Sequence, residues 1–106
     1  MKGGKPQHGF WGELDRPVYS LAPLSNVTDA AFRRVIAGRG APDVFWTEFV
    51  SADGLMHEDA RERLLPDLWF SEKEHPIVAQ IFGARPETIE GAARLAADRG
   101  FDGVDI

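Results

Sequence analysis

Apolar segments of strand length recur along this chain, and a segment of helical character follows each of the first three. The expected strands are Val18–Ala22, Val44–Val50, Ile77–Phe82 and Phe101–Ile106, spaced by about 25 to 35 residues. The expected helices run from Asp29 to about Ala37, from Glu58 to Leu65, and from Pro86 to the residue before Gly100. Such alternation is typical of a parallel sheet with right-handed crossovers.

A parallel sheet needs both faces and its edges covered, and the fourth expected strand has no helix after it. We therefore interpret the chain as the N-terminal portion of an α/β (β/α)8 TIM barrel, ordered βα-βα-βα-β and truncated within or just after strand 4, since such barrels have about 250 residues. Residues 1–17 are expected to form a tail without a regular element, from which Phe10 and Trp11 could pack on the fold. Residues 18–106 are expected to form the incomplete barrel domain. A small doubly wound domain is the alternative.

Composition narrows the class of protein. The 106 residues include 12 basic and 17 acidic side chains, and they lack the concentrated basic patch typical of a nucleic-acid-binding surface. Hydrophobic residues make up 43% of the chain, as in globular proteins, yet no apolar run approaches the about 20 residues that cross a bilayer. The absence of cysteine excludes disulfides, thiolate zinc sites and a cysteine nucleophile within these residues. We expect a cytoplasmic protein with no membrane contact and no metal.

The segment Leu21–Arg34 has the pattern of a strand end, a short turn and the start of a helix. Pro23 lacks a backbone donor, so strand pairing should end near it. Asn26 tolerates the left-handed backbone of a tight turn, and Thr28 is predicted to be the helix N-cap. Such a joint presents backbone groups at the carboxyl end of a strand, where α/β proteins bind ligands, but it also suits an ordinary strand–helix connection.

Three further expectations concern local structure. The helix after Asp29 should bury an apolar stripe that includes Phe32 and Val35. Residues Ser51–Met56 should form a loop, and Lys73–His75 a solvated turn.

Two polar residues interrupt the apolar strands. Glu48 must point into a polar cavity, sit at the open end of its strand, or form an internal salt bridge. Gln80 is flanked by Ala79 and Ile81, and a buried amide needs partners for both its carbonyl and its NH₂ group. Neighbouring backbone or a ligand could supply those partners.

Four blocks of sequence resemble the opening segments of the tRNA-dihydrouridine synthases, in that family's order and spacing. The blocks are Leu-Ala-Pro-Leu-Ser-Asn-Val-Thr-Asp-Ala-Ala-Phe-Arg-Arg, Thr-Glu-Phe-Val-Ser-Ala, Val-Ala-Gln-Ile-Phe-Gly and Asp-Gly-Val-Asp-Ile. The resemblance covers about residues 18 to 106. In the first block, Leu24, Ser25 and Asn26 stand where the family commonly has Met, Ala and Gly.

The resemblance implies an FMN enzyme that takes electrons from NADPH and reduces a uridine of its tRNA partner to dihydrouridine. It implies that Pro23, Leu24 and Ser25 lie against the flavin ring and that Gln80 bonds its polar edge. The family's general-acid cysteine, in an Asn-x-Gly-Cys-Pro motif, would lie beyond Ile106, as would a lysine, later phosphate-binding loops and a helical tRNA-binding domain. The chain alone is therefore expected to be inactive.

Two alternative functions remain. One is another FMN-dependent barrel oxidoreductase, of the dihydroorotate dehydrogenase or old yellow enzyme type, which the combination of the first and third blocks argues against. The other is a non-catalytic half-barrel that works by pairing with a partner chain and should form a defined dimer.

Overall fold

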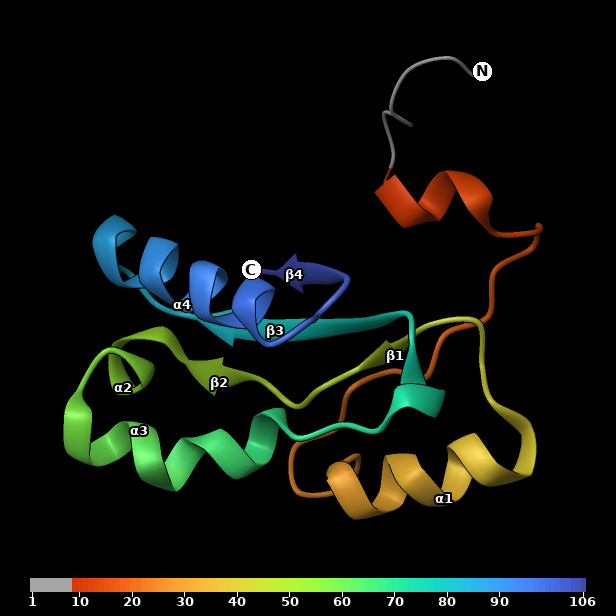
Figure 1. Ribbon diagram of the computed structural model, residues 1–106, viewed down its shortest axis with the longest axis horizontal. Coiled ribbons are helices and arrows are strands. Elements are labelled where there is room, and N and C mark those ends of the chain that lie inside the picture. The colour runs from red at the N-terminus through yellow and green to blue at the C-terminus, as the bar shows by residue number, and fades with distance from the viewer. Residues whose placement is uncertain (1–8) are drawn as a thin grey trace.

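The computed structural model describes residues 9–106 and shows helices packed on short parallel strands (Figure 1). The strands of this described part are β1 (Phe45–Trp46), β2 (Val50–Ser51), β3 (Ile77–Phe82) and β4 (Gly103–Asp105). Its α-helices are α1 (Ala30–Gly40), α2 (Ala52–Leu55), α3 (Glu58–Leu64) and α4 (Pro86–Asp98). Its 3-10 helices are η1 (Gly9–Glu13), η2 (Leu65–Leu68) and η3 (Glu72–Glu74).

Strand β3 is the centre of the sheet. Trp46 of β1 and Gly103 of β4 both pair in parallel with Val78, so β1 and β4 lie on opposite edges of β3. β2 also pairs with β3, further along the chain direction. β1 and β2 are therefore two parts of the strand predicted over residues 44–50, interrupted at residues 47–49.

Each segment of the sheet lies beside its neighbour in the sequence. A doubly wound sheet would reverse this order at a switch point, and no reversal occurs among the described strands. The order is consistent with a partial TIM-barrel-like domain.

The first predicted strand is much shorter than expected. Of Val18–Ala22, only Ser20 forms a bridge, in parallel with Val44. The amide of Leu21 donates to the Val44 carbonyl at 3.2 Å, but the amide of Tyr19 donates to the side chain of Asp43. The amide of Asp43 in turn donates to the Tyr19 carbonyl at 2.7 Å, so the pairing of this segment is confined to residues 19–21.

The hydrophobic core lies between one face of β3 and the helices α2 and α4. Ile77 and Ile81 of β3 are almost fully buried there, against Ala92 and Ala96 of α4. The predicted strand Ile77–Phe82 and the helix beginning at Pro86 are confirmed as β3 and α4.

We call the other face of β3, which carries Val78, Gln80 and Phe82, the open face. Helix η1 covers its amino end, where a Cβ atom on Gly103 would lie 3.3 Å from Phe10. Trp11 packs on Trp46 with ring centroids 5.9 Å apart. The expectation that this part of the tail has no regular element is wrong, and residues 1–8 of the tail lie outside the described residues.

Helix α1 differs from its prediction in both cap and buried face. Asp29, not Thr28, is the N-cap, because its carboxylate accepts from the amide of Phe32 at 2.8 Å. The expected apolar stripe is wrong at Phe32 and Val35, which are 38% and 62% exposed, whereas Ile36 of the same stripe packs against the core. The buried residue of this helix is Arg33.

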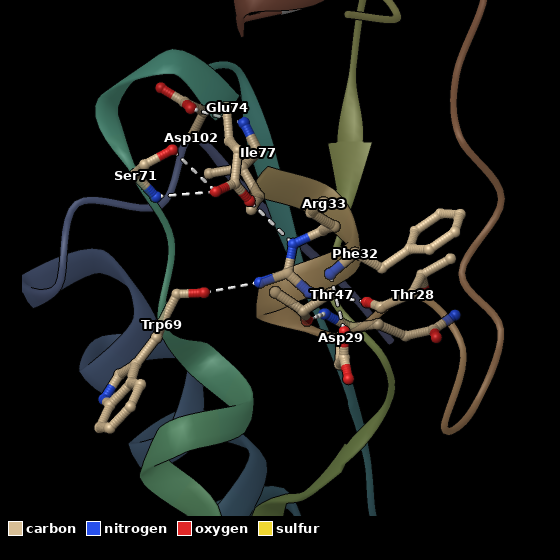
Figure 2. Close-up of polar contacts among 11 residues, drawn as sticks. Thr28, Asp29, Phe32, Arg33, Thr47, Trp69, Ser71, Glu74, Ile77 and Asp102 are labelled. Carbon is tan, nitrogen blue, oxygen red and sulfur yellow. Dashed lines mark hydrogen bonds and ion pairs between the residues drawn. The ribbon is translucent and has the colours of Figure 1, made fainter. Parts of the chain in front are cut away.

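Arg33 is enclosed by a network that spans α1 and the segment before β3 (Figure 2). Its Nε donates to Glu74 Oε1 at 2.9 Å, while Nη1 and Nη2 donate to the carbonyls of Thr28 and Trp69. The second oxygen of Glu74 accepts from the amide and hydroxyl of Ser71. The predicted solvated turn at Lys73–His75 is wrong at Glu74, which is fully buried in η3, whereas Lys73 and His75 are exposed.

The remaining connections are mostly helical. The predicted loop Ser51–Met56 instead contains the end of β2 and the short helix α2, which Ser51 caps by accepting from the amide of Gly54. Helix α3 lies where the sequence predicts it. Within residues 9–106, no helix is long and apolar enough to span a bilayer.

Candidate functional site at the carboxyl edge of the sheet

The turn after the first strand segment is closed by its own backbone and one hydroxyl. The amides of Val27 and Thr28 both donate to the Leu24 carbonyl at 3.0 Å. The hydroxyl of Thr28 accepts from the amide of Leu24 at 2.9 Å, which is why Thr28 is buried here rather than capping α1. Asn26 has φ of 63°, as its sequence position predicts. The turn exposes the side chains of Leu24 and Ser25.

Glu48 holds this turn to the sheet. It comes from the interruption between β1 and β2, is 9% exposed, and accepts a hydrogen bond from the amide of Asn26. No basic side chain pairs with it among the described residues, so the salt-bridge alternative is not observed. Its carboxylate instead joins the turn at residues 24–28 to the carboxyl edge of the strands.

Gln80 points from β3 toward β4 on the open face. Its Nε2 donates to Asp105 Oδ2 at 3.2 Å, and the indole Nε1 of Trp46 donates to the same oxygen at 3.1 Å. The backbone amide of Gln80 donates to the hydroxyl of Thr47 at 3.1 Å. Gln80 is only partly buried, because helix η1 covers the amino end of the open face and not this end.

The predicted site residues share the carboxyl edge but form two groups. Pro23, Leu24 and Ser25 belong to the turn, and Gln80 lies on β3. No hydrogen bond joins the turn to the side chain of Gln80 within residues 9–106; the link runs through Thr47 and its neighbour Glu48.

Two cavities of about 380 Å³ each lie between α1 and residues 66–72. Arg34 and Trp69 line both of them, and none of the four predicted site residues lines either. One of them is nevertheless lined by Asp67, which lies near Glu48.

The charges near the turn are acidic. Burial raises the pKa of Asp67 above its usual value, and the nearby Glu48 carboxylate raises it further, while Arg33 opposes this shift. Near the end of β2, the hydrogen bond from Thr88 lowers the pKa of Asp53. No group of three potential metal-ligating carboxylate, histidine or cysteine residues occurs in the described part of the chain.

Comparison with known proteins places the chain in a family. The model of the dihydrouridine synthase family (Dus) matches residues 20–106. The chain belongs to the dihydrouridine synthase family. The match includes all four sequence blocks, from the turn at the first strand segment to Asp105.

Similar proteins carry the same family name. The chain is 44% identical over 97 residues to "Probable tRNA-dihydrouridine synthase 2" of Bacillus subtilis (strain 168), which covers 92% of this chain and 30% of that relative. It is 41% identical over 100 residues to "Probable tRNA-dihydrouridine synthase" of Staphylococcus aureus (strain Mu50 / ATCC 700699), covering 94% of this chain and 30% of the relative. The chain thus spans about a third of the length of these relatives.

Within this dihydrouridine synthase segment, sequence reasoning missed Trp46, Thr47 and Asp105 as members of the carboxyl edge. The sequence alone does not mark them as site residues, since Asp105 is one of many acidic residues and Trp46 has the pattern of a core aromatic. The parallel register that places Gln80 opposite Asp105 brings them together. The roles of Pro23, Leu24, Ser25 and Gln80 in cofactor binding stay predictions.

Proposed function

We propose that these residues are part of an FMN-dependent tRNA-dihydrouridine synthase, in which the carboxyl edge of the sheet binds the flavin ring. The family match over residues 20–106 supports this proposal most directly. Because the chain spans 30% of the length of its Bacillus relative, we assign the activity to a protein of that length that includes these residues.

In this proposal, residues 18–106 form the first part of a TIM-barrel flavin-binding domain, and residues 1–17 are its tail. The sequential order of the parallel strands supports the barrel. Family membership favours this function over a dihydroorotate dehydrogenase-like oxidoreductase. We also propose a cytoplasmic location, where the tRNA partner would be available.

The chemistry of the edge fits the ring of FMN. The polar side of the ring presents carbonyl oxygens and an N–H group, and the amide of Gln80 can pair with both kinds of group. Leu24 is 54% exposed and offers an apolar surface to the ring. Glu48 and Asp105 are acidic, so cationic groups from outside this set of residues would have to bind the phosphate.

When bound, FMN would supply the hydride, taken from NADPH, that reduces the C5–C6 double bond of a tRNA uridine. The residues of this chain would orient that ring: Gln80 by hydrogen bonding, and Pro23, Leu24 and Ser25 by contact with its surface. The chain contains no cysteine, so we expect the general acid beyond Ile106 and no activity from residues 1–106 alone.

A tRNA assay tests the function. A protein of the relatives' length that contains these residues is incubated with FMN, NADPH and tRNA lacking dihydrouridine. We expect dihydrouridine to form, and the 106-residue chain to form none under the same conditions. If the longer protein binds FMN and tRNA but forms no dihydrouridine, the proposal is wrong.

A further inference from the structure

One oxygen of Asp105 accepts two side-chain hydrogen bonds on the open face of the sheet. The amide Nε2 of Gln80 donates to it from 3.2 Å and the indole Nε1 of Trp46 from 3.1 Å. Parallel pairing sets Gln80 directly opposite Asp105, and Trp46 opposite Val78 on the same face. Three strands therefore contribute to one small cluster.

The donors and acceptors of these groups determine the orientation of the Gln80 side-chain amide. An ionised carboxylate has only acceptors, so it must face the NH₂ group of Gln80 and not its carbonyl oxygen. An indole N–H is only a donor, so Trp46 adds a second bond that holds the carboxylate in place. Oε1 of Gln80 accepts no hydrogen bond from any residue in the described part of the chain.

We infer that Asp105, held by Trp46, is a positioning residue that turns the carbonyl oxygen of Gln80 toward the ligand. This inference rests on the proposed function, in which the ligand is the flavin ring. The ring's imide N–H is then the group that Gln80 recognises, and Asp105 selects it without touching the cofactor.

Nuclear magnetic resonance of the ligand-free, isotope-labelled chain at pH 7 tests the positioning. Both donors bind one oxygen, so we expect a nuclear Overhauser effect between the side-chain amide protons of Gln80 and the indole N–H of Trp46. One amide proton should also exchange slowly with water. Asp105→Ala should abolish both signals.

Asp102→Ala is the matched control. Asp102 precedes β4, and its Oδ2 likewise accepts two bonds, from the amide of Ile77 and the ring of His75. It lies at the amino end of the sheet, so its loss should leave the Gln80 signals intact. The inference is wrong if, in the wild type, both side-chain amide protons of Gln80 exchange rapidly with water and show no nuclear Overhauser effect to the indole N–H of Trp46.

Flavin selectivity tests the ligand-facing atom. In a protein of the relatives' length that contains these residues, the affinity for FMN is compared with the affinity for FMN methylated at the imide nitrogen, which lacks the N–H. In Asp105→Asn the new amide can donate to Gln80, so Gln80 can reverse, and the wild-type preference for FMN should fall roughly tenfold, the equivalent of one hydrogen bond. An unchanged ratio would overturn the inference.

The comparison uses the ratio of the two flavin affinities in each protein. The steric effect of the methyl group is common to the wild type and Asp105→Asn, so it cancels when their ratios are compared. If the wild type binds neither flavin while the effect to Trp46 is present, the proposed function is wrong and the positioning of Gln80 stands.

Discussion

The ion pair between Arg33 and Glu74 should give the largest loss of stability of any single side-chain change outside the apolar core. The two side chains are 0% and 1% exposed, and their charged atoms lie 2.9 Å apart. In Arg33→Met, Glu74 keeps its bonds from Ser71 but loses its counter-charge. The carbonyls of Thr28 and Trp69 lose their donors as well.

The structure sets the scale of this loss. Removing one partner of a buried ion pair costs about 3–5 kcal/mol, because the remaining charge stays buried without compensation. Each orphaned carbonyl that water cannot reach adds about 1–3 kcal/mol. We therefore expect Arg33→Met to lower the free energy of unfolding by at least about 3 kcal/mol. Glu74→Gln should lower it by a similar amount, and the double variant by less than the sum of the two.

Urea unfolding followed by circular dichroism measures these changes, and an exposed pair provides the control. Arg94 and Glu90 form an ion pair one helical turn apart on α4, with side chains 76% and 66% exposed. Such pairs contribute roughly 0.3–0.5 kcal/mol. Arg94→Met should therefore change the free energy of unfolding by less than about 1 kcal/mol. Equal effects of Arg33→Met and Arg94→Met, or additive effects of the buried pair, would refute the reasoning.

Three further predictions concern a pH effect, a helix cap and association. The hydrogen bond to Asp102 raises the pKa of His75. This pair should therefore stabilise the fold fully below about pH 6.5 and progressively less as pH rises through the raised pKa. In unfolding curves, Asp102→Asn should reduce this dependence of the free energy of unfolding on pH. Asp29→Ala should cost about 1 kcal/mol in urea unfolding and Asp29→Asn, which can still accept from the amide of Phe32, clearly less; equal, near-zero costs would show that Asp29 is not the cap. Because the open face leaves apolar side chains exposed, the chain should associate in gel filtration; a sharp monomer peak across concentrations would contradict this.

The sequence predicts best where one strong local pattern decides the structure. Strand β3 has the predicted bounds, because Ile77–Phe82 is apolar apart from Gln80 and lies between Pro76 and Gly83. Helix α4 begins at Pro86 as predicted, since proline is favoured in the first turn. These two elements also form the core of the described structure.

The sequence predicts poorly where a distant partner decides the structure. Helical periodicity assigns Arg33 to the surface, whereas its burial depends on the distant Glu74 and Trp69, 41 and 36 residues away. Thr28 and Asp29 are equally good caps by composition, and the bond from Thr28 to the turn at Leu24 decides between them. The strand at residues 44–50 is interrupted near Glu48, whose carboxylate binds the turn instead.

The same limit applies to the site. The alternation of strands and helices predicts that the turn at Pro23–Ser25 and Gln80 share the carboxyl edge, because parallel strands all end there. The partner of Gln80 could not be predicted, because it depends on the register between β3 and β4. That register sets Asp105 beside Gln80.

Flavin binding by Gln80 variants tests the central claim, that this edge binds the ring of FMN. In a protein of the relatives' length that contains these residues, Gln80→Ala and the nearly isosteric Gln80→Leu remove hydrogen bonds worth about 1–3 kcal/mol. FMN affinity per folded molecule should then fall roughly ten- to a hundredfold. Because the bond from Gln80 to Asp105 is only partly buried, its loss in Gln80→Leu should lower the unfolding midpoint only slightly. If both variants instead lower the midpoint strongly while each folded molecule binds FMN as the wild type does, Gln80 is a structural amide and the claim is wrong.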